Sequence, residues 1–214
     1  MIAPKSKKVP DHSRLEAELL REALGAAAHD LGGVASAMGL RLDALGPSPT
    51  ADDLRAVGSI LGEIRALGRQ LRQLRGPRGG GALAPARSAS LRSWWSLVER
   101  FGRALLGRGV ALEGTADESE LTPEQFHALA FGMLAFCRGI RERELTNPSC
   151  LTVTAHRGAG GVIVALLLRG PSGEPLPISE AGDPWDAYAR DTLSANGFEL
   201  TREGETLTIV IPAR

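Results

Sequence analysis

His29 is the residue whose type and surroundings best suit it to chemistry. A neutral imidazole nitrogen is a competent nucleophile for phosphoryl groups at neutral pH. Asp30 follows His29 directly, and its carboxylate could orient the ring or accept a proton. We therefore consider His29, with Asp30 beside it, as a candidate phospho-accepting site.

The neighbours of His29 on its helical face are unusually small. Residues three and four positions away share a face of a helix. Here they are Gly25, Ala26, Gly32 and Gly33. Each glycine costs a helix interior roughly 1 kcal/mol relative to alanine, so stability does not explain the choice. We interpret these four residues as a bare surface on which another protein's active site can approach His29. An exposed histidine without function on a glycine-tolerant helix stays open as the alternative.

Residues 14–45 have the heptad pattern of a long helix that packs against other helices. The two apolar positions of the repeat are filled by Ala17, Leu24, Leu31, Met38 and Leu45 and, three residues later, by Leu20, Ala27 and Val34. With Leu24 and Leu31 in the core seam, His29 falls at the position furthest from that seam. The pattern therefore predicts that the imidazole faces water, which argues against a buried core histidine.

A second helix is predicted after the break at residues 46–49 (GPSP), with Thr50 as its N-cap. Its apolar stripe contains Leu54, Val57, Leu61, Ile64, Leu71 and Leu74. The two helices, over residues 14–75, should form an antiparallel hairpin. Because one hairpin has too small a core to stand alone, we predict a homodimer in which two hairpins form a four-helix bundle.

Four arginines lie near the end of the second helix, namely Arg65, Arg69, Arg72 and Arg75. They could steer an acidic partner protein toward the hairpin. They could equally be cations that complement the negative end of the helix. Both interpretations are kept.

The remaining sequence divides at a segment rich in glycine, proline and alanine. Residues 76–87 are predicted to be a linker, and residues 1–13 a disordered basic tail. Residues 88–214 alternate between helical and strand patterns. They predict an α+β domain in which helices cover one layer of sheet, closed by a hairpin around Glu203-Gly204.

The composition excludes several classes of function. The 25 basic residues balance the 25 acidic ones, so charge indicates neither nucleic acid nor a membrane surface as partner. No apolar run is long enough to span a bilayer. Cys137 and Cys150 do not form a metal-ligand spacing, and no metal or cofactor site is predicted. A cytoplasmic protein is the expected location.

These features together resemble the sensor histidine kinases. Ala28-His29-Asp30-Leu31, followed by a long amphipathic helix, resembles their H-box. The hairpin resembles their dimerisation and phosphotransfer domain. Residues 88–214 resemble their catalytic ATPase domain in element order, ending in a strand at residues 207–212 (LTIVIP).

The nucleotide-binding motifs of that family are missing. The resemblance aligns Gly132 and Phe136 with asparagines that hold Mg²⁺ and phosphates, and Leu168 with the aspartate that reads adenine. Residues 175–183 contain no glycine-rich phosphate lid. Without these polar ligands Mg-ATP has no anchor, so the resemblance implies a degenerate ATPase-like sandwich.

A histidine without ATP-binding residues resembles the ChpT-type histidine phosphotransferases. That resemblance implies that His29 takes a phosphoryl group from one receiver-domain aspartate and passes it to another. The partners would be response-regulator receivers, which supply the Mg²⁺. Gly33 stands where kinases with phosphatase activity often carry Asn or Thr, which argues against a dedicated phosphatase. Two alternatives remain: a non-catalytic dimeric adaptor that sequesters a receiver or kinase, and a divergent histidine kinase.

Overall fold

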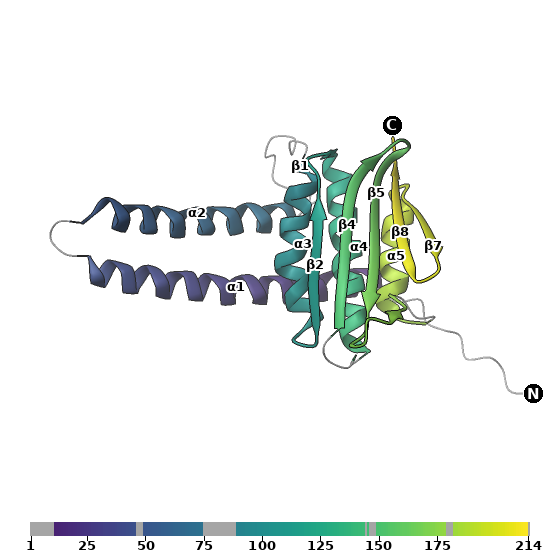
Figure 1. Ribbon diagram of the computed structural model, residues 1–214, viewed down its shortest axis with the longest axis horizontal. Helices are drawn as coiled ribbons and strands as arrows, with labels where there is room; N and C mark the ends of the chain where they lie inside the picture. Colours follow the sequence, from purple (N-terminus) through teal and green to yellow (C-terminus); the bar gives the residue numbers. More distant parts are fainter. Residues whose placement is uncertain are drawn as a thin grey trace, which may run out of the picture.

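The computed structural model describes residues 11–45, 49–74, 89–143, 145, 149–178 and 182–213. Most of the predicted tail, all of the predicted linker and Arg75 lie outside these described residues. The chain forms a long helical hairpin that projects from a helix-on-sheet sandwich (Figure 1). The predicted α+β class, with a hairpin followed by a sandwich, is therefore confirmed.

Local capping sets the ends of the hairpin helices α1 (His12–Ala44) and α2 (Ala51–Leu74). Asp11 caps α1 by accepting hydrogen bonds from the backbone of Ser13 and Arg14, so the helix begins two residues earlier than predicted. Thr50 caps α2 as expected, because its hydroxyl accepts a hydrogen bond from the Asp53 amide at 3.2 Å. The helices run antiparallel and pack against each other (Figure 1).

The sandwich contains three helices and eight strands among the described residues. The helices are α3 (Leu91–Leu106), α4 (Pro123–Glu142) and α5 (Pro184–Ala195). The strands are β1 (Ala89–Ser90), β2 (Val110–Ala116), β3 (Glu120–Leu121), β4 (Ser149–Gly158), β5 (Gly161–Arg169), β6 (Pro175–Leu176), β7 (Glu199–Glu203) and β8 (Thr206–Pro212).

The main sheet has the strand order β2-β4-β5-β8-β7, with β6 paired to the end of β5. The pairs β4–β5 and β7–β8 are antiparallel hairpins, the second of them predicted around Glu203-Gly204, whereas β2 runs parallel to β4. A separate two-stranded sheet joins β1 and β3. The strands β1, β3 and β6 escaped prediction because two residues are too few to show an alternating pattern.

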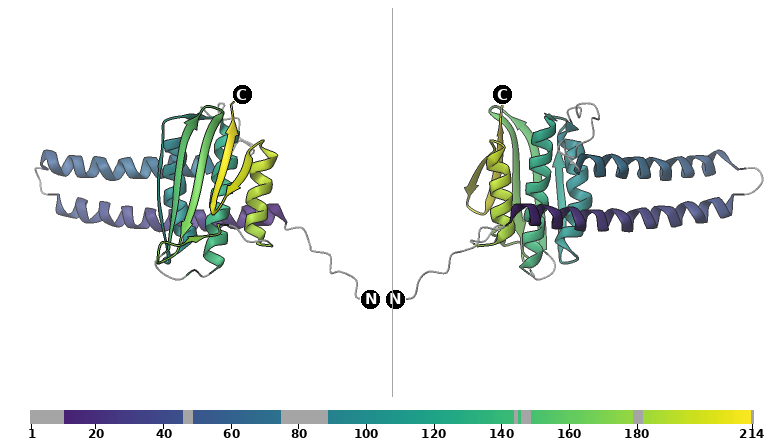
Figure 2. Two further views of the ribbon diagram at one scale, coloured as in Figure 1. Left: turned by 45° about the vertical axis from the view of Figure 1, so that its right-hand side comes forward. Right: turned by 180° about the vertical axis from the view of Figure 1, so that it is seen from behind.

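Helices α3, α4 and α5 cover one face of the sheet (Figure 2). The core between them includes the fully buried Trp94, Phe101 and Phe131. Helix α4 begins with the capping box formed by Thr122 and Gln125. It is buried on nearly all sides, because the sheet lies on one side of it and α1 crosses the other. None of the helices in the described ranges is long and apolar enough to cross a membrane.

The N-terminal half of α1 forms a third layer over the helices of the sandwich (Figure 2). Leu19, Ala23 and Ala27, spaced four residues apart, are buried in this contact with their own chain. The heptad analysis instead placed Leu24 and Leu31 in the core seam, yet their side chains are 56% and 38% exposed in the single chain. The helix carries two apolar stripes, and a single heptad index describes only one of them.

Candidate functional site

His29 lies on α1 at a cleft between α1 and α3. Its side chain is exposed, as its place in the heptad predicts. The cleft has a volume of about 440 Å³. It is lined by Glu22, Ala26, His29, Asp30, Arg100, Ala104, Leu105 and Arg141. The phospho-accepting candidate therefore sits where the hairpin meets the sandwich, beside side chains of both.

Asp30 turns toward α3 and pairs with Arg100. Its Oδ2 lies 3.5 Å from Nε of Arg100. Nη1 of Arg100 donates a hydrogen bond of 3.1 Å to Oε1 of Gln70 on α2. Gln70 in turn donates to the hydroxyl of Ser96 at 3.2 Å. Three helices are thus joined by one chain of polar contacts next to His29, and sequence reasoning did not identify Arg100 or Gln70.

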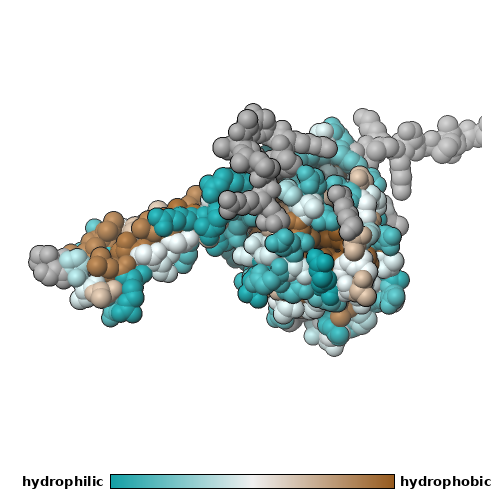
Figure 3. Space-filling model, turned by 90° about the horizontal axis from the view of Figure 1, so that it is seen from above, coloured by the Kyte–Doolittle hydropathy of each residue, from teal (hydrophilic) through white to brown (hydrophobic). Residues whose placement is uncertain are grey.

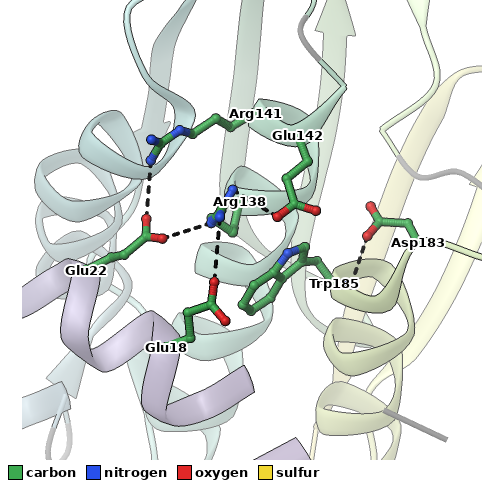
Figure 4. A network of polar contacts seen from close by, with 7 residues as sticks. All are labelled: Glu18, Glu22, Arg138, Arg141, Glu142, Asp183 and Trp185. Atoms are coloured by element: carbon green, nitrogen blue, oxygen red, sulfur yellow. Dashed lines mark hydrogen bonds and ion pairs between the residues drawn. The ribbon is translucent and has the colours of Figure 1, made fainter. Parts of the chain in front are cut away.

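The same cleft reaches a second polar network that docks α1 on α4 and α5 (Figure 4). Arg138 contacts three carboxylates, those of Glu18 at 3.6 Å, Glu22 at 3.0 Å and Glu142 at 3.1 Å. Its guanidinium also lies over the ring of Trp185, 5.5 Å from the ring centroid. Because this side chain is only 15% exposed, its charge is compensated inside the docking contact and not by water.

Open space surrounds the three glycines near His29. A Cβ added to Gly25, Gly32 or Gly33 would meet no atom within 4 Å. Ala26 differs from them, because it is half-buried, packs against the core and lines the cleft. The small residues therefore fall into two groups. The glycines leave the solvent side of His29 open, and Ala26 faces the sandwich.

The arginines of α2 lie apart from His29. Arg65, Arg69 and Arg72 are exposed, and none of them lines the cleft of His29. Arg69 instead lines a second cleft of about 400 Å³, where α2 meets the beginning of α3. The structure does not bring this basic group together with the histidine, so its role in steering a partner stays a prediction.

The three residues that the resemblance aligns with the ATP ligands of histidine kinases are buried. A Cβ added to Gly132 would lie 2.8 Å from Cγ of Leu193, so α4 and α5 are in direct contact there. Phe136 is 2% exposed and Leu168 is fully buried. Phe136 and Leu168 are thus packed in the core of the sandwich, and Gly132 lies at the contact between α4 and α5.

The described part of the stretch aligned with the phosphate lid contains a short strand and a helix cap. Pro175 and Leu176 form strand β6 against β5, and Asp183 caps α5 by accepting a hydrogen bond of 2.8 Å from the Trp185 amide. Burial raises the pKa of the Asp183 carboxyl. Residues 179–181 lie outside the described residues.

Metal-ligating side chains do not gather anywhere in the part of the chain that the structure describes. No group of three or more His, Cys, Asp or Glu residues there could hold a metal ion. The imidazole of His12 lies 3.2 Å from Asp191, and the ring of His127 stacks on Phe131 with centroids 4.5 Å apart. His12 thus joins α1 to α5, and His127 contacts a residue of its own helix α4, whereas His29 is exposed.

The sequence matches no family model and no curated protein. Similar solved structures include the blue-light activated histidine kinase of Erythrobacter litoralis EL346, with 14% identity and a TM-score of 0.49 over 74% of this chain and 55% of that one. The histidine kinase domain of that protein has 14% identity and a TM-score of 0.47, and the match covers 92% of this chain and 93% of that domain. A bacterial phosphotransferase has 14% identity and a TM-score of 0.38, and the match covers 90% of this chain and 95% of that one. This chain thus spans about half the length of the light-activated kinase. Identities and TM-scores this low carry no argument about activity, which must rest on the site itself.

Proposed function

We propose that this protein is a histidine phosphotransferase of a two-component phosphorelay, which carries phosphoryl groups between receiver-domain aspartates through His29. One observation carries the proposal. The His29 imidazole is exposed at an open cleft, and at Gly25, Gly32 and Gly33 no side chain stands between it and an approaching protein.

The transfer is a balanced exchange of one bond for another. A ring nitrogen of neutral His29 uses its lone pair to form an N–P bond, while the O–P bond of the receiver's aspartyl phosphate breaks. The electron pair of that bond stays on the aspartate carboxylate, and the other ring nitrogen releases its proton to water. The return step reverses these changes on a second receiver. Donor and acceptor atoms must approach within roughly 3–3.5 Å in line, which the open glycine surface permits.

The packing of the sandwich supports transfer without kinase activity. Gly132, Phe136 and Leu168 are core residues, so they offer no ligands to Mg-ATP. In this proposal the Mg²⁺ for transfer belongs to the receiver. An exposed histidine combined with an apolar former nucleotide site is what the resemblance to ChpT-type phosphotransferases implies.

The proposal includes a homodimer held by the hairpin. All of the exposed large hydrophobic residues found in the described ranges lie on α1 or α2, and Figure 3 shows apolar side chains gathered along the projecting hairpin. They include Leu24 and Leu31 of α1 and Leu54, Leu61 and Ile64 of α2. A second copy is the occupant we propose, because its hairpin carries the same stripe and two such stripes complete a four-helix bundle.

Phosphate labelling tests the function. The full-length protein is incubated with phosphorylated receiver domains encoded by the same genome, and acid-labile label on the chain is measured with and without His29→Ala. We expect label on the native protein and none on the variant, whose fold should persist because His29 is exposed. A native protein that binds receivers without taking label would replace this proposal with the adaptor alternative. Label that persists in His29→Ala would move the site elsewhere.

A further inference from the structure

Arg100 of α3 is held in place from two other helices. Its Nε pairs with Asp30 of α1, and its Nη1 donates to Gln70 of α2. Gln70 is itself only 9% exposed and is fixed by its hydrogen bond to Ser96. A guanidinium anchored at two of its nitrogens has lost most of its rotational freedom already, so a further contact costs little entropy.

The third nitrogen of this guanidinium, Nη2, donates no hydrogen bond among the described residues. The Arg100 side chain is 31% exposed. It lines the same cleft as His29, and its partner Asp30 is the residue directly after His29. Arg100 thus brings a guanidinium whose Nη2 donates no hydrogen bond to the same cleft as His29.

We propose that Arg100 binds the phosphoryl group while that group is carried by His29, an inference that rests on the proposed function. Nη2 donates hydrogen bonds to the phosphoryl oxygens, where negative charge concentrates in the transition state and in the phosphohistidine product. Arg100 transfers no proton in this step. Its contact with Asp30 persists, so the guanidinium does not need to change partner when the phosphoryl group arrives.

Arg141 lines the cleft as well but is placed less suitably. Its Nη1 lies 3.3 Å from Oε2 of Glu22. Glu22 precedes His29 by seven residues, which is roughly 10 Å along a helix. Arg100 is instead anchored at the residue adjacent to His29. Of the two arginines, Arg100 is therefore the better candidate for the phosphoryl contact.

Phosphoramidate is a suitable probe, because it is a small phosphoryl donor that needs no protein docking surface. Its P–N bond breaks, ammonia leaves, and the N–P bond to His29 forms. The rate of His29 phosphorylation at saturating phosphoramidate is measured for the native protein, Arg100→Gln, Arg100→Lys and Arg103→Gln. Arg103 is the matched control, since it lies on the same helix but pairs with Glu99 at 2.8 Å and lines a different cleft.

We expect Arg100→Gln to lower the rate roughly 10- to 100-fold, somewhat less than the loss of a donor in a fully buried oxyanion site. Arg100→Lys keeps the charge and the ion pair with Asp30 but loses the planar fork, so it should fall in between. Arg103→Gln should label at the native rate. Melting temperatures, measured on the same samples, identify any variant that has lost its fold.

The outcomes separate this inference from the proposed function. If native His29 is labelled and folded Arg100→Gln is labelled equally fast, Arg100 is only a structural link and the inference is wrong, although the proposed function stands. Should Arg100→Gln unfold, an unchanged rate in Arg100→Lys would overturn the inference in the same way. If native His29 takes label neither from phosphoramidate nor from receivers, both proposals fail.

Discussion

At the scale of single residues, the site combines a side chain that could be recognised in the sequence with one that could not. The exposure of His29 follows from its position in the heptad, which is local information. The partner of Asp30 was not predictable in this way. Asp30 is expected to orient the imidazole or accept its proton, which stays a prediction, and its carboxylate also pairs with Arg100 from a helix much later in the chain. No local pattern encodes such a contact.

Gly33 tests whether the open surface serves docking. A Cβ there meets nothing within 4 Å, so Gly33→Ala should raise stability by about 0.5–1 kcal/mol through the loss of glycine's unfolded-state entropy. It should transfer phosphate at nearly the native rate. Gly33→Arg should also stay folded, because arginine is a good helix former. Its long side chain should, however, hold a receiver away from His29. Transfer should then slow at least tenfold, because small displacements of the reacting atoms lower the rate strongly.

The control for Gly33→Arg is Gly62→Arg on α2, where the added side chain also meets open space. It should leave both folding and transfer unchanged. Thermal denaturation and rapid-quench transfer from a phosphorylated receiver give the two readouts. A folded Gly33→Arg protein with native transfer kinetics would show that the glycines are not a docking surface.

At the scale of elements, local sequence patterns are sufficient to place helices and strands but not to predict which distant segments pair with one another. The start of α4 is defined locally by the Thr122 cap and Pro123, and β4 and β5 are defined by their apolar patterns. The parallel pairing of β2 with β4 and the docking of α1 were not foreseen. Both contacts join segments that are separated in the sequence by whole helices. The buried stripe of Leu19, Ala23 and Ala27 has no sequence feature that identifies the helices it packs against.

Arg138 should account for much of the docking of α1. Replacing it with Gln leaves the carboxylates of Glu18 and Glu22 facing each other in a partly dry contact. Removing one partner of a buried pair costs 3–5 kcal/mol, and the remaining exposure reduces this, so we expect a loss of roughly 1–3 kcal/mol of unfolding free energy. Chemical denaturation measures it, with Arg103→Gln as the control for an exposed pair. A loss equal to that of the control would mean that apolar contacts alone hold α1.

At the scale of the whole molecule, the hairpin presents one apolar stripe to its own sandwich and another to solvent. Leu31→Glu or Leu61→Glu, placed on the exposed stripe, should convert the proposed dimer to monomers or unfold it. Leu40→Glu is the matched control. Leu40 is 74% exposed but follows Leu31 by nine residues, which places it on roughly the opposite side of α1. Light scattering on the three variants is decisive, and a native protein that is monomeric would refute the four-helix bundle.

The sandwich should bind no nucleotide. Calorimetric titration of the native protein with Mg-ATP should give no heat of binding, because the residues aligned with the family's ligands are apolar or glycine and are buried in the sandwich. Micromolar affinity would contradict this prediction and revive the interpretation as a divergent kinase.

The docking of α1 also has a consequence for synthesis on the ribosome. Helix α1 is translated first, yet Glu22 meets Arg138 across a separation of 116 residues, and Trp185 follows later still. The stripe of Leu19, Ala23 and Ala27 must therefore remain exposed to solvent on the nascent chain until nearly the whole sandwich has emerged. In the dimer proposed above, the hairpin would pair through its other stripe with a neighbouring nascent chain during that interval. Chains emerging together from one polysome would then associate before either has completed its own fold.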